Sequence, residues 1–121
     1  MKIIGIGTDI INIKRVEKII KQNKTSFLKK IFTSKEISLI RGFKSNISSK
    51  VAMRFAAKEA FAKSLGTGIG EELSFLDFEV LNKKSGQPYI QSSKQKLKKM
   101  KFNLSMSDDY PWAVAFVIAS K

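Results

Sequence analysis

The segment from residue 51 to residue 66, VAMRFAAKEAFAKSLG, constrains the fold more than any other part of the sequence. Polar residues suited to capping precede it and Gly66 follows it, so it predicts a helix of roughly four turns over residues 50–65. Apolar side chains occupy nearly every direction around this helix. The rest of the chain therefore has to cover it on most sides.

Two apolar segments near the ends of the chain predict buried strands. Residues 2–8, KIIGIGT, are short and β-branched and are bounded by turn residues, which indicates a strand that ends at Asp9. Residues 112–119, WAVAFVIA, are apolar on both faces. A strand of that kind is expected to lie in the centre of its sheet.

Between the first strand and the long helix, the pattern changes to helical spacing. From Asn12 onward, apolar residues recur every three or four positions with lysines on the other side, which predicts an amphipathic helix. Residues 27–32 form a second short helical stripe. Thr33 and Glu36 form a capping box, which predicts a third helix that ends near Gly42.

The second half of the chain alternates short strands with one helix. In order, we expect a strand over residues 73–82 with Leu76, Phe78 and Val80 on one face, a hairpin turn at KKSGQP, a short strand at Tyr89 and Ile90, a lysine-rich helix after Ser93 with Leu97 and Met100 inward, a strand over residues 102–106, and a turn from Asp108 to Pro111. This order predicts a single α+β domain over residues 1–121, with an antiparallel sheet covered by helices.

Composition excludes several classes of protein. The 121 residues suit one domain, and 43% hydrophobic content excludes a disordered chain. No stretch approaches the ~18 apolar residues of a membrane span, and the N-terminus lacks the pattern of a signal peptide, so we expect a cytoplasmic protein without a membrane partner. Because the chain has no Cys and no His, a disulfide framework and a soft-ligand metal site are excluded. Any metal must be held by oxygen.

A formal net charge of +13 predicts an anionic partner. Only three of the 23 basic residues are Arg, which argues against a protein that reads nucleic-acid bases. A lysine-rich coding bias would also produce much of this charge without any function.

Two carboxylates raise the question of a site, and each has a plain structural interpretation. Glu59 lies on the same helical face as Lys63, one turn later, so the two residues could form a simple ion pair. Asp9 could cap the helix that begins near Asn12. The glycines at 5–7 and 66–70 match neither a dinucleotide fingerprint nor a Walker loop. Taken one at a time, these segments favour the structural interpretations.

Together, the motifs are more specific. In chain order they are GIGTDI at 5–10, Arg15, FTSKE at 32–36, RFAAKEAFAK at 54–63, GTGI at 66–69, GQPY at 86–89 and SMS at 105–107. This set resembles the small holo-acyl-carrier-protein synthases, a family of 4′-phosphopantetheinyl transferases. The resemblance runs from residue 3 to about residue 119, and RFAAKEAFAK is its most diagnostic part.

The resemblance implies an enzyme that moves phosphopantetheine from coenzyme A to a serine of apo-acyl carrier protein, and that requires Mg²⁺. Asp9 and Glu59 match the family's metal ligands, and Lys63 matches its phosphate-contacting lysine. The family is usually a trimer with each site between neighbouring subunits. The resemblance further implies coenzyme A contacts at Arg54, Lys63, Gly66, Ser107 and Asp108, and a carrier-protein contact at Arg15.

Asp108 departs from the family pattern, because many members carry His after the Ser-x-Ser/Thr of this strand. A carboxylate facing a phosphate repels it. Either Asp108 turns away and caps the bend before Pro111, or it accepts a hydrogen bond from the ribose or adenine.

Two other functions are considered. A basic nucleic-acid-binding module would explain the charge, but the sequence has no helix-turn-helix spacing, zinc knuckle or RNP-type motif. A noncatalytic carrier-protein-binding subunit would differ from the enzyme only in a dead metal site.

Overall fold

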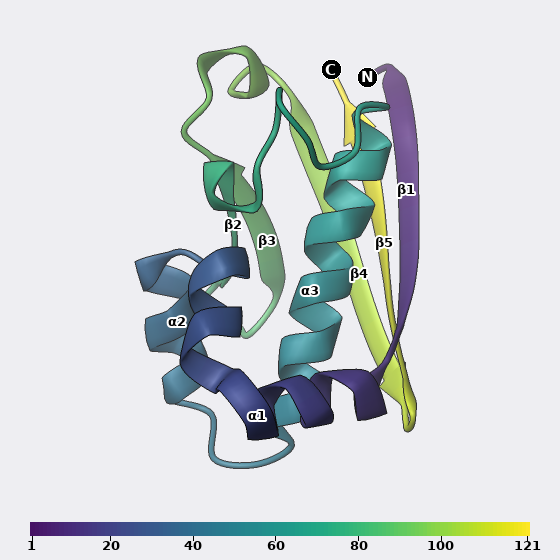
Figure 1. Cartoon of the computed structure of the whole chain (residues 1–121). Coiled ribbons are helices and arrows are strands. Elements are labelled where there is room, and N and C mark those ends of the chain that lie inside the picture. The colour runs from purple at the N-terminus through teal and green to yellow at the C-terminus, as the bar shows by residue number, and fades with distance from the viewer.

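Helix α3 lies between two antiparallel sheets, and α1 crosses one end of it (Figure 1). The computed structural model describes residues 1–121. The elements are β1 (Ile3–Asn12), α1 (Ile13–Ile31), α2 (Ser34–Arg41), α3 (Ile47–Ser64), β2 (Phe78–Asn82), β3 (Pro88–Ser92), β4 (Lys101–Asp109) and β5 (Trp112–Ser120). The predicted α+β class is confirmed. No helix in the structure is both long and apolar enough to cross a bilayer.

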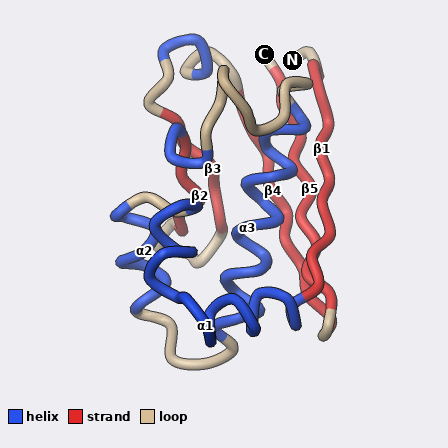
Figure 2. Tube along the Cα trace, viewed as in Figure 1, coloured by secondary structure: helices blue, strands red, loops and turns tan.

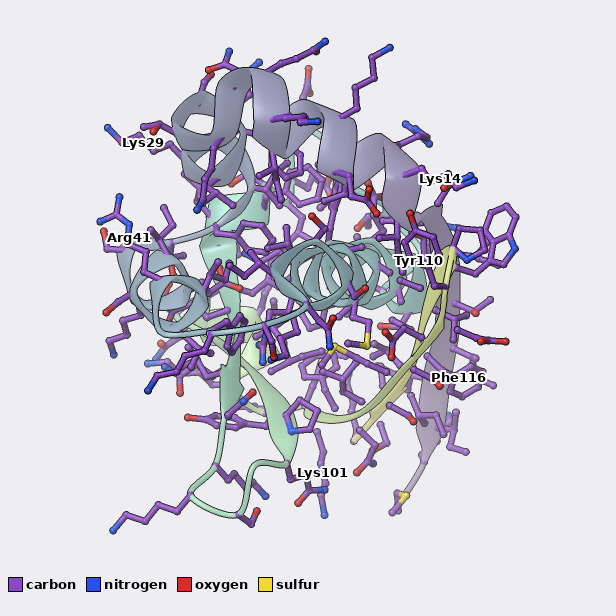
Figure 3. All side chains as sticks on the ribbon, turned by 90° about the horizontal axis from the view of Figure 1, so that it is seen from below. Lys14, Lys29, Arg41, Lys101, Tyr110 and Phe116 are labelled. Atoms are coloured by element: carbon purple, nitrogen blue, oxygen red, sulfur yellow. The ribbon has the colours of Figure 1, made fainter.

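The larger sheet has the strand order β1-β5-β4, and the smaller one pairs β2 with β3. The prediction that the last strand is central is therefore confirmed. Ala113, Ala115 and Val117 are fully buried on one face of β5, whereas the outer face exposes apolar side chains. Figure 3 shows Phe116 on the side of the sheet away from α3.

Glycines in β1 allow α3 to pack very closely on the larger sheet. A Cβ at Gly7 would lie 1.8 Å from the carbonyl oxygen of Ala60, and one at Gly5 would lie 1.9 Å from that of Ser64. Both clashes are with helix backbone, which cannot move aside as a side chain can. The GIG sequence thus serves close packing between a strand and a helix.

The first helical region contains the two expected helical stretches, which are joined at a kink. Residues 13–31 form one element, with a non-helical backbone at Asn23 (φ −158°, ψ 59°) between the two predicted apolar stripes. The capping box of Thr33 and Glu36 at the start of α2 is confirmed. Helix α3 begins at Ile47, three residues earlier than predicted.

Three predictions in the second half are wrong. Only a 3₁₀ turn (Gln95–Leu97) stands in place of the lysine-rich helix, as Figure 2 shows in the loop between β3 and β4. Leu97 is the one buried residue of this turn, too little apolar contact to support a helix of mutually repelling lysines. Strand β2 begins at Phe78, because the three preceding residues form another 3₁₀ turn that leaves Leu76 51% exposed. Strand β4 continues through Asp109, so Asp108 lies in a strand rather than in a turn.

Candidate active site

Strand β1 carries Asp9 on the side that faces α3. Residues alternate along this strand, so Ile10 is exposed on the outer face while Ile11 is buried. The Lys63 ammonium of α3 lies 3.1 Å from Asp9 Oδ1 and also donates a hydrogen bond of 3.1 Å to the carbonyl oxygen of Thr8. The end of β1 and the last turn of α3 therefore meet through this ion pair.

The simple interpretations of the two carboxylates are both wrong. Lys63 pairs with Asp9, and Glu59 is not among the ion-paired carboxylates of the chain. Helix α1 is capped by Asn12, whose side chain accepts a hydrogen bond from the Lys14 backbone N–H. Neither Asp9 nor Glu59 is thus accounted for by a local structural role.

Glu59 is the third charged group at the site, beside Asp9 and Lys63. Burial raises the pKa of its carboxyl above the ordinary value, and the Asp9 carboxylate raises it further, while the Lys63 ammonium acts in the opposite direction. The repulsion between Asp9 and Glu59 favours a cation that both can share. A raised pKa next to a charge partner in a cleft is also typical of a functional group.

A cavity of about 300 Å³ opens between β1, α1 and α3. One part of its wall is charged, and the rest is apolar. Its lining consists of Asp9, Ile10, Ile11, Arg15, Val16, Ile19, Phe55, Glu59 and Lys63. The structure thus brings together four of the predicted site residues from three elements far apart in the sequence.

The donors at this cavity fit Mg²⁺. Asp9 and Glu59 supply carboxylate oxygens, and no group of three or more His, Cys, Asp or Glu exists that would form an all-protein metal cage. Mg²⁺ is usually held by one or two carboxylates together with substrate phosphates and water. The arrangement therefore suits a metal that binds together with a phosphate-bearing substrate.

The other predicted site residues lie elsewhere in the chain. Arg54 is buried, and its guanidinium donates hydrogen bonds to the Val80 carbonyl oxygen (3.1 Å) and to Asn82 Oδ1 (2.7 Å). Ser107 and Asp108 are exposed on β4, which β5 separates from β1. The contacts of these three residues with coenzyme A stay predictions.

Gly66 ends α3 in the left-handed conformation (φ 79°), and its N–H donates to the carbonyl oxygen of Lys63. No atom lies within 4 Å of the place where its Cβ would be. The backbone is therefore open to a ligand three residues beyond Lys63, but its contact with coenzyme A also stays a prediction.

Two features of the site were missed at the level of sequence. The apolar wall is one of them, and the helical spacing of its two α1 residues was the available signal; it consists of Ile10, Ile11, Val16, Ile19 and Phe55. The other is the buried ion pair of Glu36 and Lys58, of which Lys58 directly precedes Glu59 in the sequence. Nothing in the sequence indicates this pair, because its members are 22 residues apart and on different helices.

Comparison with known proteins shows the family of this chain. Residues 5–115 match the model of the 4′-phosphopantetheinyl transferase superfamily. The chain belongs to this superfamily. A holo-[acyl-carrier-protein] synthase of Ruthia magnifica is 48% identical over 122 residues, which cover 96% of this chain and 95% of the relative.

Solved structures show the same fold as this transferase. A holo-(acyl-carrier-protein) synthase from Bacillus anthracis, in complex with CoA (3′,5′-ADP), has a TM-score of 0.87 and 40% identity, with 100% of this chain and 99% of that chain covered. The Helicobacter pylori holo-[acyl-carrier-protein] synthase in complex with coenzyme A has a TM-score of 0.85 and 39% identity, with 95% and 99% covered.

Proposed function

We propose that this transferase moves the 4′-phosphopantetheine group of coenzyme A to a serine hydroxyl of an apo-acyl carrier protein, with Mg²⁺, and releases adenosine 3′,5′-bisphosphate. The observation that carries the proposal is the meeting of Asp9, Glu59 and Lys63 at one cavity. Two similar solved proteins are complexes with coenzyme A or its 3′,5′-ADP part, which supports the choice of substrate.

The residues divide the chemistry between them. Asp9 and Glu59 would hold the metal, which when bound supplies Lewis-acid neutralisation of the pyrophosphate charge. Lys63 contributes an ammonium that stabilises the negative charge developing on the bridging oxygen. The new bond joins the serine oxygen to the β-phosphorus, and the bond from that phosphorus to the bridging oxygen breaks.

The charge of the chain supports an acidic carrier protein as the acceptor. Helix α1 carries basic residues along its exposed side, and Figure 3 shows Lys14 and Lys29 projecting outward from it. Arg15 lies at the edge of the active-site cavity, on the first turn of the same helix. An acidic helix docked on α1 would thus be held next to the reacting phosphate.

The bare outer face of the larger sheet supports an assembly of identical chains. Ile6, Ile10, Trp112, Val114 and Phe116 are all exposed large hydrophobic residues on β1 and β5. A monomer rarely leaves such a contiguous face in water. The trimer implied by the family would cover it, and would allow Ser107 and Asp108 of one chain to serve a neighbour's site.

The direct test is mass spectrometry of an apo-acyl carrier protein incubated with this transferase, coenzyme A and Mg²⁺. We expect the mass of the carrier to increase by one phosphopantetheine group. No increase is expected when EDTA is present from the start of the reaction. If none of several apo-carrier proteins is modified at any metal concentration, the proposal is refuted.

A further inference from the structure

We propose that the buried ion pair between Lys58 and Glu36 positions Glu59 for metal binding, by fixing the rotation of α3 about its own axis. This inference rests on the proposed function, because it concerns the same site. Neither residue lines the active-site cavity. Both therefore act through Glu59 as positioning residues.

Lys58 is held at three points. Its side chain is 0% exposed, and its ammonium lies 2.6 Å from Glu36 Oε1, whose side chain is 1% exposed. The same ammonium donates to the carbonyl oxygens of Phe75 (2.5 Å) and Phe78 (2.9 Å). An ammonium has three donors, and all three are used here.

Glu36 is fixed as firmly on the other side of the pair. Its Oε1 accepts the backbone N–H of Thr33 at 2.9 Å, and its Oε2 accepts that of Val80 at 2.9 Å. The carboxylate therefore joins α2, β2 and α3. Because its partners are backbone groups of capped or paired elements, it offers Lys58 a fixed reference point.

A second cation strengthens the same attachment one turn earlier in α3. Arg54 precedes Lys58 by four residues and therefore lies on the same helical face. Its hydrogen bonds to Val80 and Asn82 end on β2, as the contact of Lys58 with Phe78 does. Two successive turns of α3 are thus tied to one strand.

Phe61 is the one aromatic side chain fully buried on α3, and it stacks on Phe78 of β2. The other apolar contacts of α3 define its rotation poorly. Its buried apolar residues point in nearly all directions, and most are alanines that resemble one another in shape, namely Ala52, Ala56, Ala57, Ala60 and Ala62. Hydrogen bonds are directional, whereas the hydrophobic effect is not. Successive residues on a helix are ~100° apart, so holding Lys58 against β2 also determines where Glu59 points relative to Asp9.

Stability is a weak explanation for such a pair. Replacing a buried ion pair by apolar residues of similar size is often neutral or stabilising, because both charges lose their hydration on folding. A protein that needed only a stable core could use two methionines here. The pair differs from methionines in that it specifies one orientation of the helix.

The test is the double variant Glu36→Met/Lys58→Met, compared with Val51→Ala. Val51 is buried on α3, does not line the cavity and takes no part in the hydrogen bonds of Arg54, Lys58 and Glu36, so Val51→Ala lowers stability without breaking the attachment. We would measure the melting temperature, Mn²⁺ affinity by electron paramagnetic resonance with coenzyme A present, and kcat and KM for the carrier protein. For the double variant we expect a melting temperature near that of the wild type, Mn²⁺ binding weakened by about tenfold or more, a lower kcat, and an unchanged KM for the carrier.

For Val51→Ala we expect the opposite pattern: a lower melting temperature and wild-type Mn²⁺ affinity. A double variant with wild-type Mn²⁺ affinity and kcat overturns the inference, as does an equal loss of Mn²⁺ affinity in Val51→Ala. If the double variant does not fold, Glu36→Gln is judged by the same comparison. A wild-type protein that neither binds Mn²⁺ nor modifies a carrier refutes the proposed function, and the positioning role with it.

Discussion

At the scale of single residues, the Lys63 ammonium forms an ion pair with Asp9 and also acts to lower the pKa of Glu59, which burial and the Asp9 carboxylate raise. Asp9→Ala and Glu59→Ala should each abolish transfer while leaving a folded protein, because each removes a ligand needed by the metal and the pyrophosphate together. The transfer assay and circular dichroism would be run on the same samples. Near-wild-type turnover in either variant would exclude that residue from the metal site.

Glu59 also predicts a dependence of stability on pH. Its pKa is higher in the folded chain than in the unfolded one, so the folded state binds the proton more tightly. The resulting stabilisation is complete below the unfolded pKa and is lost as the pH rises through the folded pKa. Without metal, Glu59→Gln should therefore melt at a higher temperature than the wild type at pH 7.

The difference in melting temperature between Glu59→Gln and the wild type should shrink as the pH approaches about 4, where the wild-type carboxyl is protonated. Thermal unfolding in EDTA at several pH values measures it. A variant less stable than the wild type at pH 7 would show that attraction to Lys63 outweighs both the burial of Glu59 and its repulsion by Asp9.

Substitutions of Asp108 and Lys63 should have very different effects on the kinetics of transfer. Asp108 is exposed in β4. Whether it turns away from coenzyme A or accepts a hydrogen bond from the ribose or adenine, it has no role in the chemical step, so Asp108→Ala should keep turnover and change the KM for coenzyme A by less than about tenfold, or ~1.4 kcal/mol. Lys63→Ala should lose far more activity, mainly through a lower kcat. Steady-state kinetics with coenzyme A varied distinguishes the two. Loss of turnover for Asp108→Ala at saturating coenzyme A would place it in the chemistry.

At the scale of elements, the site depends on how closely β1 and α3 approach. Gly7→Ala should destabilise the protein by about 3 kcal/mol or more, since its Cβ would meet the Ala60 carbonyl oxygen at 1.8 Å. Gly70→Ala is the matched control, because nothing lies within 4 Å of the place where its Cβ would be. Urea unfolding of both variants tests the prediction. Equal stability of the two would mean that the helix and strand can separate without cost.

At the scale of the whole molecule, the exposed apolar face of β1 and β5 predicts an oligomer. Phe116 is 42% exposed there, between Thr8 of β1 and Ser105 of β4. We expect the wild type to have the mass of three chains by light scattering, and Phe116→Asp to be a folded monomer, because a charge in an apolar interface loses its hydration. Lys29→Asp on α1 should leave the assembly intact. A monomeric wild type would contradict the prediction.

Features that depend on local periodicity can be predicted from the sequence alone. The cap of α2, the extent of α3 to within a few residues, the hairpin of β2 and β3 and the central place of β5 all follow from spacing and turn residues within short windows. The residue types of the site were also available, because a chain without His or Cys leaves carboxylates as its metal ligands.

Which of these groups meet depends on how the elements pack in three dimensions. Lys63 could pair with Glu59 one turn away or with Asp9, 54 residues earlier, and the close packing of β1 on α3 selected Asp9. Lys58 and Arg54 lie four residues apart on a mostly apolar helix, and only the structure shows that both are buried against β2. The reason is that a charge pattern records only which groups are present, whereas burial and pairing depend on what another part of the chain places beside them.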